Sequence, residues 1–149
     1  MCLGEDMPNF KVPNLQNKII IQITDTHLMD HPDTEFVQMN PEQSFHQVMD
    51  DVLQRFPHID ALVHTGDLAQ IATAETYARY QNYMQKLGIP FFQIPGNHDD
   101  LSLFPFHRPD PIPTVIELGE WSIILLNSVI QGRTDGWIQA EQLQLLKQT

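Results

Sequence analysis

The chain has 149 residues, enough for one domain whose core buries roughly two-thirds of its unfolded surface. Hydrophobic residues make up 42% and aromatic residues 9%, a composition that excludes an intrinsically disordered protein. Nineteen acidic against eight basic residues give a formal net charge of −11. Because Lys and Arg form no cluster, we expect neither a nucleic-acid partner nor an anionic membrane as partner.

The N-terminal segment and the single cysteine bear on the cellular compartment. Residues 1–17 form a polar leader that lacks the basic-then-apolar pattern of a secretory signal. Cys2 is the only cysteine, so an intrachain disulfide is excluded and a reducing compartment is compatible. No apolar stretch reaches the ~20 residues of a membrane span. These features together predict a cytoplasmic protein.

Three apolar runs predict strands, and two helices are predicted between them. The runs are Lys18–Thr24, Ala61–Thr65 and Ile89–Ile94, the first of them rich in β-branched residues. The order β-α-β-α-β favours a parallel sheet with right-handed crossovers. In such sheets ligands bind beyond the carboxyl ends of the strands.

Capping residues mark the two predicted helices. The first begins at Pro41 after the N-cap Asn40 and ends before Pro57. The second covers Thr73–Leu87, and Gly88 suits the position that follows a helix. The first helix has a predicted buried stripe with steps of three and four, formed by Phe45, Val48, Met49, Val52, Leu53 and Phe56.

The last third of the chain predicts a loop, a hairpin and a helix. Residues 101–113 contain four prolines, so we expect an irregular loop near the site. Thr114–Leu118 and Trp121–Asn127 predict a hairpin around Gly119-Glu120. A final helix is predicted from about Ile138 to Thr149, and both tryptophans, Trp121 and Trp137, are predicted to pack in the core or at an interface.

A polar cluster follows each predicted strand: Asp25-Thr26-His27, Gly66-Asp67 and Gly96-Asn97-His98-Asp99. Positions i and i+2 of a strand point to the same side, so Asp25 and His27 can bind one ion together. The Asp67 carboxylate can bridge two ions, and Asn97 offers an amide oxygen. Two ions about 3.5–4 Å apart can bind a phosphate and lower the pKa of a bridging water. The clusters therefore predict phosphoester hydrolysis.

Other residues near the clusters have predicted supporting roles. We expect His98 to donate a proton to the leaving oxygen or to stabilise phosphoryl charge, and Asp99 to orient its ring and hold it protonated. His64 is predicted to pack or hydrogen-bond within its strand rather than to bind metal. The remaining histidines are predicted to be mainly solvent-exposed: His31, His46, His58 and His107. Each cluster alone is a weak signal, and the prediction depends on their ordered conjunction.

These motifs resemble those of the calcineurin-like metallophosphoesterase family. Gln22–Leu28, Thr65–Gln70 and Pro95–Asp99 are similar to the bacterial class III cyclic-nucleotide phosphodiesterases. The resemblance implies a dinuclear centre of divalent ions (Fe, Mn or Zn), with 3′,5′-cyclic nucleotides such as cAMP hydrolysed by a metal-bound water. Another phosphoester substrate remains an alternative.

The resemblance also implies roles for individual residues. The first ion would be held by Asp25, His27 and Asp67, and the second by Asp67 and Asn97. Substrate phosphate would contact His98 beside the ligands His27, Asp67 and Asn97. The family's remaining ligands are histidines of later motifs, so we expect an incomplete second site and an inactive or nearly inactive 149-residue chain. Substitution by His31 or His107 is a less favoured alternative.

The family fold is a four-layer α/β/β/α sandwich. Residues 18–149 are therefore expected to form its truncated N-terminal half, as β-α-β-α-β followed by a hairpin and a helix. The inner face of the sheet is expected to be left uncovered, as an apolar patch through which the chain could self-associate. The alternative to an enzyme is a non-catalytic fragment or partner-dependent module.

Overall fold

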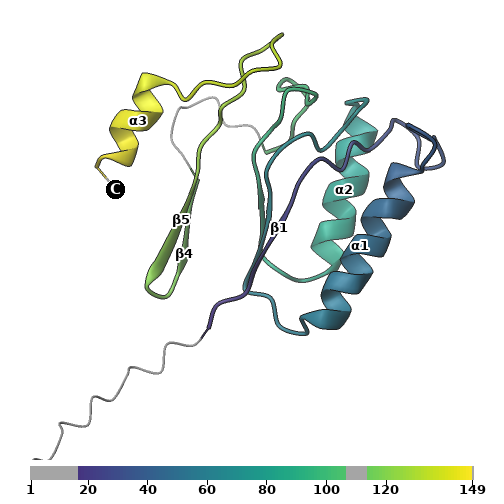
Figure 1. The fold of residues 1–149 in the computed structure, drawn as a ribbon, viewed down its shortest axis with the longest axis horizontal. Coiled ribbons are helices and arrows are strands. Elements are labelled where there is room, and N and C mark those ends of the chain that lie inside the picture. The colour runs from purple at the N-terminus through teal and green to yellow at the C-terminus, as the bar shows by residue number, and fades with distance from the viewer. Residues whose placement is uncertain (1–16, 107–113, 149) are drawn as a thin grey trace, which may run out of the picture.

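The computed structural model describes residues 17–106 and 114–148. Within these ranges the elements run, in chain order, β1 (Ile20–Ile23), α1 (Pro41–Arg55), β2 (Ala61–His64), α2 (Ala74–Lys86), β3 (Phe91–Gln93), β4 (Thr114–Leu118), β5 (Trp121–Leu125) and α3 (Ala140–Leu146). None of the described helices is long and apolar enough to span a membrane. The predicted order of elements is confirmed (Figure 1).

The first three strands form a parallel sheet in the order β1-β2-β3. Ile20 lies opposite Ala61, and Leu62 lies opposite Phe91. Two right-handed crossovers that advance in the same direction leave both helices on one face of such a sheet. Figure 1 shows α1 and α2 side by side on that face. Every residue of β2 is buried, as expected for the central strand.

The main core fills the space between this sheet and its two helices. Tyr77 and Tyr80 of α2 are almost completely buried there, as are Phe45 and Met49 of α1. The predicted stripe of α1 is only partly correct, because Val48 is 51% exposed and Phe56 is exposed as well. Val48 lies toward β1, the edge strand, and no described element covers it from beyond that edge.

The hairpin of β4 and β5 packs on the opposite face of the parallel sheet. Gly119 takes a φ of +68°, as the first position of its tight turn requires. Val63 of β2 meets the hairpin residues Ile116 and Leu125 in a second, smaller core. The expectation of an uncovered inner face is therefore wrong at β2, where the hairpin buries Val63, while Phe92 and Ile94 beside it stay only partly buried.

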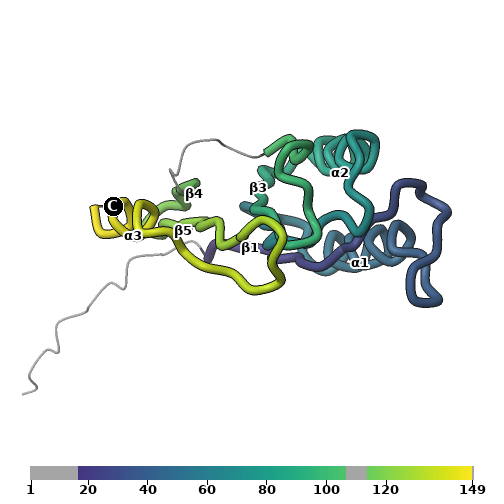
Figure 2. The backbone as a smooth tube through the Cα atoms, turned by 90° about the horizontal axis from the view of Figure 1, so that it is seen from above, coloured from purple at the N-terminus to yellow at the C-terminus, as the bar shows by residue number. Residues whose placement is uncertain are grey.

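Helix α3 lies beyond the hairpin, at the end of the molecule opposite α1 (Figure 2). The buried side chain of Gln142 fixes it, because its amide accepts from Asn127 N (2.9 Å) and donates to Asn127 O (2.8 Å). The predicted packing of the tryptophans in the core is wrong, because Trp121 is 68% and Trp137 69% exposed, and their packing at an interface stays a prediction. Trp121 begins β5 beside the hairpin turn and Trp137 ends a surface loop, where few atoms lie around them.

Candidate metal centre

Loop hydrogen bonds continue the pairing of β1 with β2 beyond the strand ends. Asp25 N donates to Gly66 O (3.0 Å), and His27 N donates to Asp67 O (3.0 Å). Asp25, His27 and Asp67 all adopt left-handed backbone, with φ values of 55°, 45° and 51°. The extended i, i+2 geometry that was predicted for Asp25 and His27 is therefore wrong, since β1 already ends at Ile23. Strained residues of this kind gather at functional sites when the surrounding structure holds them in place.

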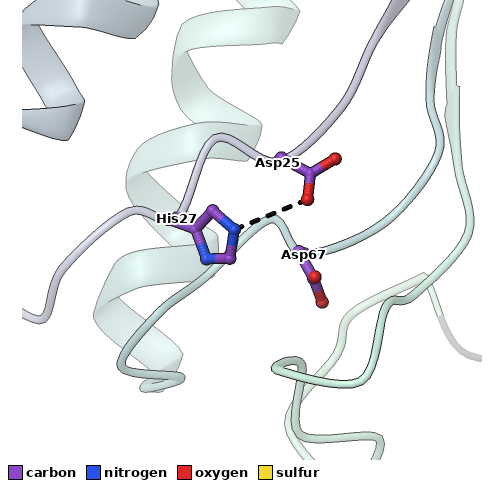
Figure 3. Close-up of side chains that lie close together, drawn as sticks. All are labelled: Asp25, His27 and Asp67. Carbon is purple, nitrogen blue, oxygen red and sulfur yellow. Dashed lines mark ion pairs between the residues drawn. The ribbon is translucent and has the colours of Figure 1, made fainter. Parts of the chain in front are cut away.

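The three residues nevertheless bring their side chains to one point, as the sequence predicted. One ligand atom from each of Asp25, His27 and Asp67 lies within 4.8 Å of the other two. Figure 3 shows the three side chains close together on the loops that follow β1 and β2. Asp25 Oδ1 lies 3.5 Å from His27 Nε2. Among the described residues, no lysine or arginine pairs with either carboxylate.

The hydrogen bonding of His27 fits this group to a cation. Its Nδ1 lies 2.9 Å from Oε1 of Gln70, which can only accept, so Nδ1 carries the ring proton. The neutral ring then presents the lone pair of Nε2 to Asp25 Oδ1, an acceptor facing an acceptor. A bound cation, or a second ring proton, removes this conflict. An outer amide that fixes the tautomer of a histidine is typical of metal sites.

Two glycines let the ends of β2 and β3 come together behind Asp67. A Cβ atom on Gly96 would lie 2.2 Å from both N and Oδ1 of Asp67, and one on Gly66 would lie 3.0 Å from Gly96 Cα. This close approach allows His98 N to donate to Asp67 Oδ1 at 2.9 Å. Backbone of the third cluster thus orients the carboxylate that was predicted to bridge two ions.

Asn97 is exposed and lines the same polar cavity as Asp25 and Asp67, which measures about 190 Å³. The opposite wall of this cavity is the loop 128–136, which joins β5 to α3. A second polar cavity of about 240 Å³ continues along that loop past His98. The site is therefore open to solvent on the side of the third cluster.

His98 and Asp99 take separate positions. The exposed His98 ring meets the His27 ring edge-on, with centroids 5.1 Å apart. The Asp99 carboxylate is buried and accepts from Gly96 N, Leu68 N, Ala69 N and the Tyr77 hydroxyl, at 2.8–3.2 Å. The expectation that Asp99 orients the His98 ring is therefore wrong, since these donors occupy the carboxylate. Asp99 instead fixes the second cluster to the third.

The neutral ring of His64 connects the first two clusters through hydrogen bonds to Thr26 and Gly66. The Thr26 hydroxyl donates to Leu68 O (2.9 Å), so it accepts from His64 Nε2–H (3.0 Å). Gly66 N then donates to the other ring nitrogen, Nδ1, at 3.3 Å. Burial lowers the pKa of His64 to about 4, partly opposed by the negative charge of Asp25. The prediction that His64 hydrogen-bonds within the fold is confirmed.

The remaining histidines lie away from the triad or outside the described residues. His31 and His58 are exposed, as predicted, and His107 falls outside the described residues. His46 is only partly exposed, because its ring stacks on Tyr83 at a centroid distance of 4.4 Å. A further cavity of about 430 Å³, mostly apolar, borders Asp25 and His27 on the side of Phe36, Met39 and Val48.

A sequence profile described as calcineurin-like phosphoesterase matches residues 19–144. The chain belongs to this family. It is 36% identical over 134 residues to the 3′,5′-cyclic adenosine monophosphate phosphodiesterase CpdA of Haemophilus influenzae, covering 87% of this chain and 49% of that protein. It is 33% identical to a 3′,5′-cyclic-nucleotide phosphodiesterase of a Nostoc species, covering 85% of this chain and 49% of that protein.

A more distant relative carries a different name. The chain is 26% identical over 133 residues to an Arcobacter nitrofigilis protein named "Probable glycerophosphodiester phosphodiesterase GpdQ", covering 84% of this chain and 49% of that protein. The chain thus spans about half the length of the curated relatives it matches.

Two supporting residues of the candidate metal centre were not assigned a role from the sequence. Gln70 fixes the tautomer of His27, and the Tyr77 hydroxyl helps to hold Asp99. Gln70 lies three residues beyond Asp67 and ends the motif Thr65–Gln70 that carried the family resemblance, which was the signal available for it. Tyr77 fits the apolar stripe of its helix equally well as a plain core residue, so the sequence carries no separate signal for it.

Proposed function

We propose that the protein carrying this chain is a metal-dependent phosphodiesterase that hydrolyses 3′,5′-cyclic nucleotides such as cAMP. The observation that carries this proposal is the convergence of Asp25, His27 and Asp67, in a family of phosphoesterases, at the wall of a polar cavity. The names of the relatives support a cyclic nucleotide as substrate.

The donor set suits two divalent ions of Fe, Mn or Zn. Asp25, His27 and Asp67 would hold the first ion, and Asp67 with Asn97 would contribute to the second. When bound, such ions supply Lewis-acid activation of water and neutralise charge on the phosphate. The His98 backbone fixes one oxygen of Asp67, and Gln70 fixes His27, so both ligands keep their orientation before any ion binds.

His98 is the proposed proton donor to the leaving oxygen. Its ring is exposed and lies beside that of His27, so it borders the substrate side of the triad. Asp99 is proposed as a positioning residue, because its four hydrogen bonds hold the loop that carries Asn97 and His98. A general acid of this kind typically contributes 10²–10⁴-fold to a rate.

The same donor set suggests that residues 1–149 alone hydrolyse a phosphodiester substrate slowly. The described residues bring three ligand atoms close enough for one ion, whereas the second ion is proposed to rely on Asp67 and Asn97 alone, both of which line the polar cavity. We expect weak binding of the second ion by the isolated 149-residue chain, and function as a partner-dependent module if further donors come from another polypeptide.

The test is a hydrolysis assay of the full-length protein that carries this sequence, with bis(p-nitrophenyl) phosphate and cAMP as substrates. We expect hydrolysis that needs Mn²⁺ or Fe²⁺, falls at least a hundredfold in Asp67→Ala, and persists in the control Asp33→Ala, whose carboxylate is exposed outside the triad. Metal-independent turnover, or equal rates in wild type and Asp67→Ala, would remove the proposal.

A second candidate substrate class is a glycerophosphodiester, favoured by the relative from Arcobacter nitrofigilis. Its ester oxygens belong to open-chain alcohols, whereas both ester oxygens of a cyclic nucleotide belong to one sugar. Comparing kcat/KM for glycerophosphoethanolamine and cAMP under identical metal conditions separates the two classes. A higher value for glycerophosphoethanolamine would replace the cyclic nucleotide in the proposal.

A further inference from the structure

The loop 128–136 forms one wall of both polar cavities beside the triad. Ser128, Thr134 and Asp135 face the cavity that contains Asp25, Asp67 and Asn97. Gln131 and Gly132 line the neighbouring cavity with His98. The two cavities share Asn97 and Val129, so they form one polar trough, and Asp25 and Asp67 line its first part.

Both ends of this loop are fixed. Trp137 N donates to Ser128 O at 2.8 Å, and Val129 forms a bridge with Gly136. Gly136 allows this contact, because a Cβ atom there would lie 2.9 Å from Ser128 O. A turn closed by Arg133 N and Ile130 O at 3.0 Å sets the tip of the loop. Side chains between these points are therefore presented to the trough from a defined backbone.

Asp135 is the acidic side chain of this wall, and Arg133 holds its carboxylate. Arg133 Nε donates to Oδ1 and Nη2 donates to Oδ2, both at 2.6 Å. This pairing lowers the pKa of Asp135, so the group is an acceptor without a proton of its own. Asp135 does not join the cluster of ligand atoms formed by Asp25, His27 and Asp67. Its charge is also largely compensated, which makes it a poor ligand for a cation.

A compensated carboxylate across the trough from the triad suits a neutral donor such as a hydroxyl group. The phosphate itself is anionic and is repelled by a carboxylate, so it belongs on the side of the triad. In a ribose 3′,5′-cyclic phosphate, the 2′-hydroxyl is attached to the carbon next to an ester-bearing carbon. A phosphate at the triad therefore brings that hydroxyl into the same cavity of about 190 Å³.

We propose that Asp135 accepts a hydrogen bond from the hydroxyl of the substrate sugar that neighbours the ester, which makes the site selective for ribose over deoxyribose phosphodiesters. This inference rests on the proposed function and adds a specificity-determining residue to it. Arg133 pairs with the carboxylate, whose oxygens each keep a free lone pair for the sugar. Carboxylates also accept hydrogen bonds from the ribose 2′-hydroxyl in dinucleotide-binding folds.

The test compares cAMP with 2′-deoxy-cAMP in the full-length protein with Mn²⁺, by kcat/KM. A charged hydrogen bond supports a preference of about tenfold for cAMP in the wild type. We expect Asp135→Ala to remove this preference by slowing only cAMP, and Asp135→Asn, which retains an acceptor oxygen, to restore part of it. Arg133→Ala is the matched control, because it breaks the same ion pair but leaves the carboxylate, and it should keep the preference.

Three outcomes would overturn the inference. They are equal kcat/KM for the two nucleotides in the wild type, an equal loss for both in Asp135→Ala, and loss of the preference in Arg133→Ala to the same extent as in Asp135→Ala. Bis(p-nitrophenyl) phosphate has no sugar and is the separate probe of the metal chemistry. If it is hydrolysed in a metal-dependent way while the nucleotides are not distinguished, the inference fails alone. If neither bis(p-nitrophenyl) phosphate nor cAMP is hydrolysed, the proposed function fails, and the inference with it.

Discussion

Acidification is expected to destabilise the protein through His64, which connects the first two ligand clusters. The folded state holds its ring neutral, with Nε2–H donating to Thr26 Oγ1 and Nδ1 accepting from Gly66 N. A second proton on Nδ1 would set one N–H against another and place a charge at a 1% exposed position. The unfolded chain has no such restriction, so it binds this proton more readily.

The sign and size of the effect follow from the two pKa values. The folded-state pKa of about 4 lies below the ordinary 6.5, so the unfolded state binds more protons between these values. The free energy of unfolding therefore falls as pH drops through this window. Between pH 7 and pH 5 the expected loss is about 2 kcal/mol, and the loss approaches about 3 kcal/mol near pH 4.

Urea unfolding in EDTA at a series of pH values between 4.5 and 7 measures this loss. The variant His64→Gln should show a much flatter dependence, because the amide does not titrate, even though it is less stable at pH 7. His58→Gln is the matched control, since its exposed ring should leave the wild-type dependence unchanged. Parallel curves for the wild type and His64→Gln would refute the reasoning.

Four further predictions concern the site and its surroundings. Gly96→Ala should abolish metal binding in calorimetry, because its Cβ would lie 2.2 Å from Asp67, whereas Gly132→Ala, which meets no atom within 4 Å, should retain it at a modest cost in stability; normal binding by Gly96→Ala would contradict this. Gln70→Leu should weaken metal affinity about tenfold through loss of the hydrogen bond to His27, and an unchanged Kd would show that Gln70 has no such role. Asp99→Asn should lower the free energy of unfolding by about 3 kcal/mol and Tyr77→Phe by about 1 kcal/mol, since the carboxylate is buried under four donors; urea melts that fail to rank them so would contradict that account. Val37→Asn with Gln38→Gly should raise the free energy of unfolding by about 1 kcal/mol, because both positions have positive φ. A lower free energy of unfolding would show that the native side chains compensate for the strain.

The strands, the helices and the convergence of Asp25, His27 and Asp67 could be predicted because each has a local cause in the sequence. Asn40 and Thr73 accept from the backbone three residues on and begin their helices, as capping residues do. Parallel strands deliver whatever follows them to one edge of the sheet. The meeting of Asp25 and Asp67 therefore required only the order of the elements, and no knowledge of side-chain packing.

The partners of Asp99 and the exposure of the tryptophans could not be predicted in this way. The main-chain donors of Asp99 include Leu68 and Ala69, about thirty positions away, and they become available only once the loops are folded. Hydrophobicity favours burial of Trp121 and Trp137, but a folded surface always keeps many apolar atoms. The wall made by loop 128–136 also depends on the hairpin docking beneath it, which no local pattern encodes.

The left-handed backbone at Asp25, His27 and Asp67 lowers the stability of the fold at the three positions proposed to bind metal. Glycine at any one of these positions would raise the free energy of unfolding by roughly 1 kcal/mol, because it adopts positive φ without strain. Directed evolution for heat resistance alone should therefore enrich glycine at these three positions. The resulting proteins would be more stable but would lack the proposed metal ligands. The strain also brings an advantage, because neighbouring loops already hold the ligands before an ion arrives. Binding of an ion then requires little ordering of the chain, so the loss of conformational entropy lowers the affinity only slightly.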